Sequence, residues 1–146
     1  MKGRIVIILL LLLLAIVTCS CTSDRVIHVE ISCDTFSKNP TSMQDDLEIY
    51  IGDKIYLELC SNPSTGFEWG YKITGDKAIQ EVGHRYQAPT GDVPGTPGRQ
   101  TWVFKAVDRG NTEIFMTYSQ PWDGGIKEKW TYKIIAVVKG FVLPSP

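Results

Sequence analysis

The stretch TWVFKAVDRGNTEIFMTY, residues 101–118, decides the fold class. Trp102, Phe104 and Ala106 stand at every second position of its first half. Ile114 and Met116 repeat the spacing after a turn at residues 108–111. A period of two places apolar side chains on one face of a β-strand, whereas an amphipathic helix repeats every three to four residues. The stretch therefore predicts two strands joined by a turn.

The same reading extends along the chain in both directions. Alternating or β-branched segments predict strands at residues 26–33, 47–51, 55–59, 67–73, 78–86, 101–107, 112–118 and 130–138. No segment of useful length has helical periodicity after residue 21. About eight short strands are typical of an all-β sandwich or small barrel. We expect Trp102 and Trp130 in its core, because large aromatic residues on strands are mostly buried there.

Residues 1–20 read as a signal peptide. Lys2 and Arg4 precede an apolar run at residues 5–17, which is shorter than the roughly 20 residues a membrane span needs. Small residues and Cys19 and Cys21 follow, as at a lipoprotein processing site. Lipidation at Cys21 (or Cys19) and ordinary cleavage with release remain alternatives. Either way, we expect an exported protein, cell-surface lipid-anchored or secreted, whose domain spans residues 21–146.

Charge and cysteine content narrow the class of protein. Loss of Lys2 and Arg4 takes the formal charge from −1 to −3, so nothing favours nucleic acid as a partner. Cys33 and Cys60 are the cysteines left after processing. In an exported domain they predict one disulfide, which would contribute about 3 kcal/mol of stability. Two buried free thiols are the alternative.

Three connections between the predicted strands differ from ordinary turns. They are residues 61–66 (SNPSTG), residues 89–100, and residues 120–125 (QPWDGG). The loops follow the third, fifth and seventh predicted strands. Loops of a sandwich cluster at its two ends, so alternate loops are expected at the same end. We therefore predict that all three lie together.

The first and third loops carry distinctive residues. Pro63 and Gly66 bracket Ser64 and Thr65. Local sequence favours a plain Asn-Pro turn closed by Gly66, and a stiff projecting tip with hydroxyl groups is the alternative. Trp122 stands among glycines outside the alternating segments. It is either an exposed binding anchor or a side chain folded back over the end of the sandwich.

These motifs resemble the chagasin family. The stretch NPSTGF, residues 62–67, looks like the family's Asn-Pro-Thr-Thr-Gly-Phe loop, and the Glu68-Trp69 pair follows its pattern. GTPGRQTWVFKAVDRGNTEIFMTYSQPWDG, residues 95–124, resembles the rest of the signature. The resemblance covers residues 47–138. Ser64 replaces a threonine, Gln120 replaces an arginine and so lacks its charge and planar fork, and Cys60 is an addition.

The resemblance implies an immunoglobulin-like sandwich that inhibits papain-like cysteine proteases reversibly, occluding the catalytic cleft with three loops. It implies a monomer that binds a papain-like protease. Apart from the resemblance, we expect contact with a membrane only if a lipid is attached at the processing site, and we expect no cofactor and no metal. The protease-binding residues would be Asn62, Pro63, Ser64, Thr65, Gly66, Phe67, Gly95, Gly98, Arg99, Gln120, Pro121 and Trp122.

Two other classes of function compete with inhibition. A thiol enzyme would need a Cys–His pair drawn from Cys33, Cys60, His28 and His84, but none of these stands in a recognisable motif. An adhesion or carbohydrate-binding sandwich would use Trp122 for stacking, since the fold alone does not decide function.

Overall fold

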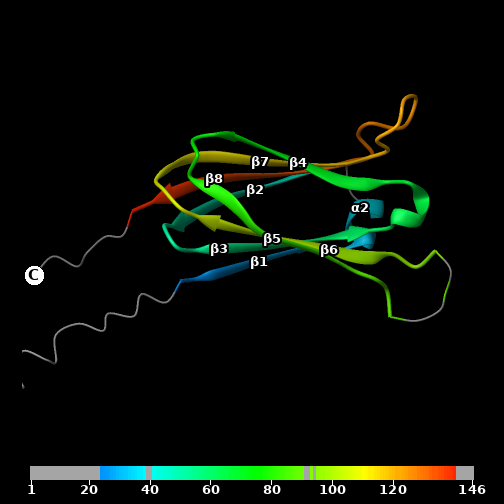
Figure 1. Cartoon of the computed structure of the whole chain (residues 1–146), viewed down its shortest axis with the longest axis horizontal. Helices are drawn as coiled ribbons and strands as arrows, with labels where there is room; N and C mark the ends of the chain where they lie inside the picture. Colours follow the sequence, from blue (N-terminus) through cyan, green and yellow to red (C-terminus); the bar gives the residue numbers. More distant parts are fainter. Residues whose placement is uncertain (1–23, 39–40, 91–92, 94, 141–146) are drawn as a thin grey trace, which may run out of the picture.

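A computed structural model describes residues 24–38, 41–90, 93 and 95–140. The predicted signal peptide and the lipidation candidates Cys19 and Cys21 lie outside these residues. The described chain forms two β-sheets packed face to face (Figure 1). The first sheet has the strand order β1-β3-β6-β5 and the second has the order β2-β8-β7-β4. The all-β, immunoglobulin-like sandwich is therefore confirmed.

The described residues contain eight strands and two short helices. In chain order they are β1 Val26–Ile31, α2 Cys33–Lys38, β2 Ser42–Tyr50, β3 Lys54–Ser61, the 3₁₀-helix η1 Pro63–Thr65, β4 Glu68–Gly75, β5 Ile79–Gln87, β6 Gly98–Ala106, β7 Gly110–Ser119 and β8 Trp130–Lys139. Neighbouring strands are antiparallel except for the pairs β1–β3 and β2–β8. No helix within the described ranges is long and apolar enough to cross a membrane.

The core lies between the two sheets and contains the predicted alternating faces. Trp102, Phe104 and Ala106 of β6 are buried, as are Ile114 and Met116 of β7. β8 contributes alternate residues in the same way, and its Trp130 is half-buried against this core. The period-two pattern thus identified the buried face of each of these strands correctly.

The first predicted strand ends earlier than expected. We predicted a strand at residues 26–33 and no helical segment of useful length, but β1 stops at Ile31 and the six-residue helix α2 begins at Cys33. Ser32 starts the helix, because its backbone and side-chain oxygens both accept a hydrogen bond from the Thr35 N–H. A six-residue helix with such a cap has too little periodicity to be detected.

β2 begins five residues before the predicted segment 47–51. Its first half holds Gln44, Asp45 and Asp46, which hide the alternation. β2 is an edge strand, so these polar side chains reach solvent at its open side. Asp45 accepts a hydrogen bond from the Tyr132 hydroxyl. Burial and this carboxylate raise the pKa of Tyr132 well above its ordinary value.

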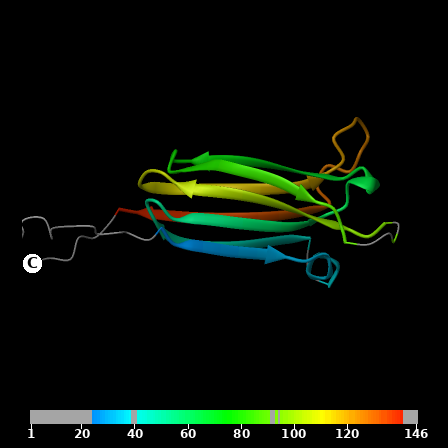
Figure 2. The ribbon, with the colours of Figure 1, turned by 60° about the horizontal axis from the view of Figure 1, so that its bottom comes forward.

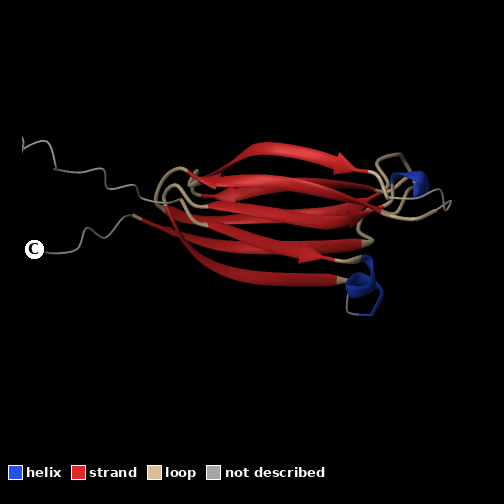
Figure 3. Cartoon of the chain, turned by 90° about the horizontal axis from the view of Figure 1, so that it is seen from below, coloured by secondary structure: helices blue, strands red, loops and turns tan. Residues whose placement is uncertain are grey.

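The connections at the two ends of the sandwich differ in length (Figures 1 and 2). At one end the chain turns within a few residues after β2, β4 and β6. The loops after β3, β5 and β7 all lie at the other end, where Figure 3 also places both helices. The predicted shared end of the three loops is thus confirmed. We call it the loop end, and the opposite one the turn end.

Candidate functional site

Loop 1, residues 62–66, connects the two sheets at the loop end. Pro63 opens η1, and Gly66 closes it with a positive φ of 75°, where its N–H donates to the Pro63 carbonyl (2.9 Å). Glycine adopts this left-handed conformation at little cost, unlike most residues. Pro63, Ser64 and Thr65 are exposed. The loop is therefore a single turn that begins at Asn62-Pro63, is closed by Gly66 and has a polar tip.

Asn62 holds this turn together. Its backbone N–H donates to the Tyr118 hydroxyl (2.8 Å), and its side-chain amide donates to the Gly95 carbonyl (2.9 Å). Its Oδ1 accepts from the Ser64 hydroxyl (2.6 Å), and its backbone carbonyl accepts from the Thr65 hydroxyl (2.6 Å). Both hydroxyl protons at the tip are thus engaged inside the loop, which leaves their oxygen lone pairs to accept bonds from a partner.

An aromatic cluster supports the loops from below. Tyr118 lies at its centre, with its ring 5.3 Å from that of Phe67, 4.9 Å from Trp69 and 5.1 Å from Trp130. Phe36 of α2 stacks on Trp130 at 4.8 Å. Because such rings interlock in few arrangements, the cluster fixes the height and direction of the residues above it.

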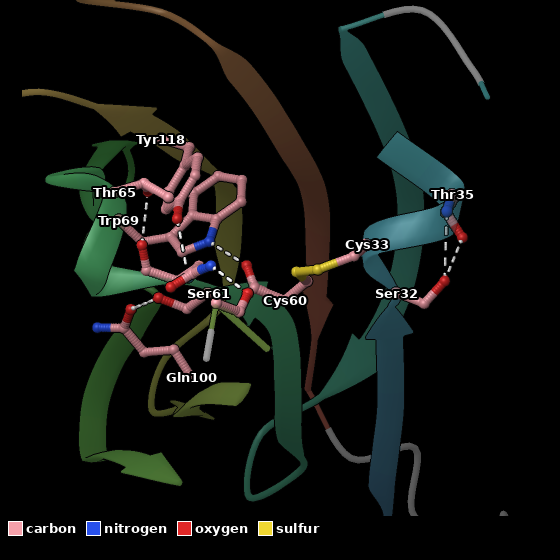
Figure 4. The surroundings of a disulfide bond; sticks show 11 residues. Ser32, Cys33, Thr35, Cys60, Ser61, Thr65, Trp69, Gln100 and Tyr118 are labelled. Carbon is pink, nitrogen blue, oxygen red and sulfur yellow. Dashed lines mark hydrogen bonds between the residues drawn. A yellow bond between two sulfur atoms is a disulfide. The ribbon is translucent and has the colours of Figure 1, made fainter. Parts of the chain in front are cut away.

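The predicted disulfide joins Cys33 to Cys60 at the base of loop 1, with the two Cα atoms 5.1 Å apart (Figure 4). It ties the first residue of α2 to β3. The Cys60 carbonyl also accepts a buried hydrogen bond from the Trp69 indole (2.8 Å). The disulfide and the aromatic cluster therefore constrain the same segment, two residues before Asn62.

Loop 3, residues 120–129, is closed by its own hydrogen bonds. Gln120 and Ile126 pair across its base, and the Gly125 N–H donates to the Trp122 carbonyl (3.2 Å). The Lys127 ammonium group donates to the same carbonyl (2.5 Å). Trp122 remains 49% exposed at the top of this closed loop. Its indole therefore lies over loop 1 at the end of the sandwich, and about half of Trp122 remains open to solvent.

Loop 2, residues 88–97, is described in part, because residues 91–92 and 94 lie outside the described ranges. Gly95 has a φ of 81°, and the Thr96 N–H and hydroxyl both donate to the Val93 carbonyl (3.2 and 2.8 Å). Val93 is 71% exposed. This part of the loop is a tight turn that presents an apolar side chain.

Loop 1 contacts both of the other loops. The Asn62 amide joins loop 1 to loop 2 at Gly95. Loop 1 meets loop 3 where the indole of Trp122 lies over Gly66, so closely that a Cβ at position 66 would overlap the ring. Gly66 is thus required for its backbone conformation and for its lack of a side chain. The loops form one surface rather than three separate tips.

This surface is apolar at its sides and polar in the middle. Among the described large hydrophobic residues, Val93 (71%), Ile126 (55%) and Trp122 (49%) have the highest exposed fractions, and all three lie in loops 2 and 3. Loop 1, with its hydroxyl groups, lies between loops 2 and 3 and contacts both. Exposed apolar groups of this kind on a rigid support are typical of a protein-binding surface.

The structure separates the predicted site residues into two groups. Most lie on the loop surface. Phe67 and Gly98 do not, because Phe67 is buried in the aromatic cluster and Gly98 is a buried residue of β6 packed against Tyr86. Their prediction as contact residues is corrected, since in this conformation they support the loops from inside.

Arg99 lies at the foot of loop 2, in β6. Its guanidinium contacts the carboxylates of Glu58 (2.6 Å) and Glu30 (3.2 Å). The hydrogen bond to Glu58 and the two negative charges raise its pKa further. Since Arg99 is already paired with these neighbours, a contact with a partner would have to compete with them.

Two important residues of the loop end were missed by sequence reasoning. Tyr118 was assigned only to a strand, yet its hydroxyl anchors Asn62. Ile126 was not singled out, although an exposed isoleucine next to Asp-Gly-Gly, outside any alternating segment, is the same signal that identified Trp122.

The cysteines and histidines considered for thiol catalysis take part in other contacts and do not form a Cys–His pair. Cys33 and Cys60 form the disulfide, so neither offers a thiolate. The imidazole of His28 lies against Tyr56, and that of His84 stacks on Trp102. Within the described part of the chain, no group of three or more His, Cys, Asp or Glu side chains is arranged to hold a metal ion.

Comparisons with known proteins agree with this geometry. A family model described as "Chagasin family peptidase inhibitor I42" matches residues 48–135, which include all three loops. Chagasin from Trypanosoma cruzi is 28% identical over 82 residues, covering 53% of this chain and 74% of chagasin. Amoebiasin-2 from Entamoeba histolytica is 31% identical over 93 residues, covering 61% of this chain and 75% of that protein.

A solved structure supports the fold. The crystal structure of the cysteine protease inhibitor EhICP2 from Entamoeba histolytica matches with a TM-score of 0.57 and 23% identity, covering 69% of this chain and 100% of that one. The family match spans more than half of this chain, from β2 into β8. The chain belongs to the chagasin family, whose members are peptidase inhibitors rather than enzymes.

Proposed function

We propose that this protein inhibits papain-like cysteine proteases by inserting loop 1 into the catalytic cleft while loops 2 and 3 contact the cleft walls. The observation that carries the proposal is the joining of the three family loops into one surface through the Asn62–Gly95 hydrogen bond and the Gly66–Trp122 contact. A surface that is already rigid loses little conformational entropy on binding.

The polar tip suits the chemistry of such a cleft. A papain-like protease holds a thiolate beside a protonated histidine, which donates hydrogen bonds. The hydroxyl oxygens of Ser64 and Thr65 remain acceptors because their protons are given to Asn62. Ser64 therefore replaces the usual threonine without loss of this acceptor.

Inhibition of this kind is reversible and steric. The cysteines of the described domain are joined in the disulfide, so no thiol is available there for exchange with the protease. Trp122 supplies the main apolar contact, as exposed aromatic anchors do in other protein interfaces. The inhibitor acts as a monomer, since one copy carries the whole surface.

Export and anchoring belong to the same proposal. A disulfide persists in oxidising compartments, which supports export by the signal peptide at residues 1–20. β1 enters the fold at the turn end, opposite the loops (Figure 1). If Cys21 carries a lipid, the loops therefore face away from the membrane, towards proteases in the surrounding medium.

The direct test is titration of papain with residues 22–146, which contain the whole described sandwich. Papain is reduced beforehand and freed of reductant, so that the disulfide stays intact. We expect activity to fall linearly to zero at one inhibitor per enzyme. No inhibition of papain or of a cathepsin L-type enzyme would overturn the proposal.

A further inference from the structure

Loop 3 is held by an arrangement that its sequence does not reveal. The Gln120 N–H donates to the Ile126 carbonyl (2.7 Å), and the Gln120 side-chain Oε1 accepts from the Ile126 N–H (3.1 Å). One residue thus satisfies both backbone polar groups of the other. The pair closes the base of the loop as a rung of a strand ladder would.

A second contact ties the top of the loop to this base. The Lys127 ammonium group donates to the Trp122 carbonyl (2.5 Å) and lies 3.4 Å from the Gln120 carbonyl oxygen. Lys127 is therefore engaged inside the loop. The backbone from Gln120 to Lys127 is fixed at both its base and its top.

This arrangement leaves an isoleucine side chain in water. Ile126 has both backbone groups paired, yet its side chain is 55% exposed. It belongs to the same closed loop as Trp122, which is 49% exposed. An exposed apolar side chain on a rigid backbone loses little entropy when a partner covers it.

We propose that Ile126 is a second apolar contact residue for the target protease, and that Gln120 is the positioning residue that holds it in place. This inference rests on the proposed inhibitory function and refines it. Where the family has an arginine before Pro-Trp, this chain uses the acceptor oxygen of a glutamine to organise the loop. Loop 3 consequently contacts the cleft wall at two points, Ile126 and Trp122.

Two substitutions at position 120 distinguish the positioning role of Gln120 from a direct contact between its amide group and the protease. Gln120→Glu keeps an acceptor for the Ile126 N–H but removes the donor group, whereas Gln120→Leu keeps the size and removes both. We expect Gln120→Leu to weaken inhibition of papain by roughly three- to tenfold, the value of one hydrogen bond, and Gln120→Glu to stay within about threefold of wild type. Gln80→Leu, on exposed β5, is the matched control.

Ile126→Ala tests the contact itself. Removal of most of an isoleucine side chain from a buried interface is expected to weaken inhibition by about tenfold. If Ile126→Ala inhibits papain as strongly as the wild-type protein does, Ile126 is not a contact residue and the proposal is overturned. Equal weakening by Gln120→Glu and Gln120→Leu would instead identify the amide as a direct donor and overturn the positioning role.

A measurement on the free protein distinguishes failure of this inference from failure of the proposed function. Hydrogen exchange at the Ile126 amide is read by NMR without any protease. We expect protection in wild type and Gln120→Glu, and exchange at least about tenfold faster in Gln120→Leu, since the N–H then lacks its acceptor. Equal exchange rates in all three proteins would overturn the positioning role even if papain were not inhibited.

Discussion

The two ends of the sandwich use different means to close the same strands. At the turn end, the buried Asp53 and the exposed Asp76 tie short turns to the backbone. Asp53 accepts hydrogen bonds from the backbone N–H groups of Tyr50 (2.9 Å) and Arg25 (3.1 Å) and pairs with the Arg25 guanidinium (3.0 Å). Asp76 likewise accepts from the Asn111 N–H (2.8 Å).

At the loop end, long connections stand on the aromatic cluster and the disulfide. They leave Val93, Ile126 and Trp122 exposed. At the turn end, these backbone polar groups are thus paired within the protein. At the loop end, apolar side chains and acceptor oxygens stay exposed and are available to contact a partner. We conclude that the turn end serves stability alone, whereas the loop end carries the binding surface on a base that the disulfide and the aromatic cluster stabilise.

The disulfide carries the largest expected effect. Replacement of Cys33 and Cys60 together by serine removes a cross-link between residues 27 apart and should lower the free energy of unfolding by about 3 kcal/mol. Urea denaturation monitored by tryptophan fluorescence measures this. Inhibition of papain should weaken as well, because the cross-link supports loop 1. An unchanged unfolding free energy would show that α2 and loop 1 are held without it.

Asp53→Ala should affect stability alone. The change leaves the N–H groups of Tyr50 and Arg25 without their acceptor and should cost about 2 kcal/mol of unfolding free energy. Denaturant unfolding checks the loss, and papain titration at a temperature where the variant is folded checks function. A larger inhibition constant for the folded variant than for wild type would contradict the division between the two ends.

Trp122→Ala should do the reverse. Loss of the exposed indole is expected to cost about 2 kcal/mol of binding free energy, or roughly thirtyfold in the inhibition constant. Its unfolding free energy should change little, because half of the side chain is already in water. An inhibition constant equal to that of wild type would mean that loop 3 does not contact the protease as proposed.

Ser64→Ala should have the smallest effect. It removes the hydroxyl that donates to Asn62 Oδ1 (2.6 Å) and offers an acceptor to the target. We expect a loss of at most about 1 kcal/mol of binding free energy, since an exposed hydrogen bond contributes little net. Ser64→Thr, which restores the family residue, is the matched control and should inhibit at least as well as wild type.

Much of the fold was predictable because burial of one sheet face imposes a period of two. The segments that became β6, β7 and β8 have one face in the core, so their alternation was clear. The start of β2 was missed because Asp45 and Asp46 stand at an open edge where charge is tolerated. Helix α2 was missed because the disulfide and Phe36 stabilise it through distant residues.

The candidate site divides in the same way. Pro63, Gly66 and Trp122 were recognisable, since their residue types have local consequences for the backbone or for exposure. Two contacts were not recognisable: the hydrogen bond that the Gln120 side chain accepts from the Ile126 N–H, and the one that the Asn62 N–H donates to the Tyr118 hydroxyl. Both depend on side-chain direction and on residues brought together only by folding. The burial of Phe67 and Gly98 was missed for the same reason.

The measurement that tests the division most directly is hydrogen–deuterium exchange of residues 22–146, free and bound to papain. We expect the complex to protect amides of residues 62–66 and 120–126, while those at the turns 51–53, 75–78 and 107–110 exchange as in the free protein. Protection at the turn end, with loops 1 and 3 unchanged, would contradict the assignment of protease binding to the loop end.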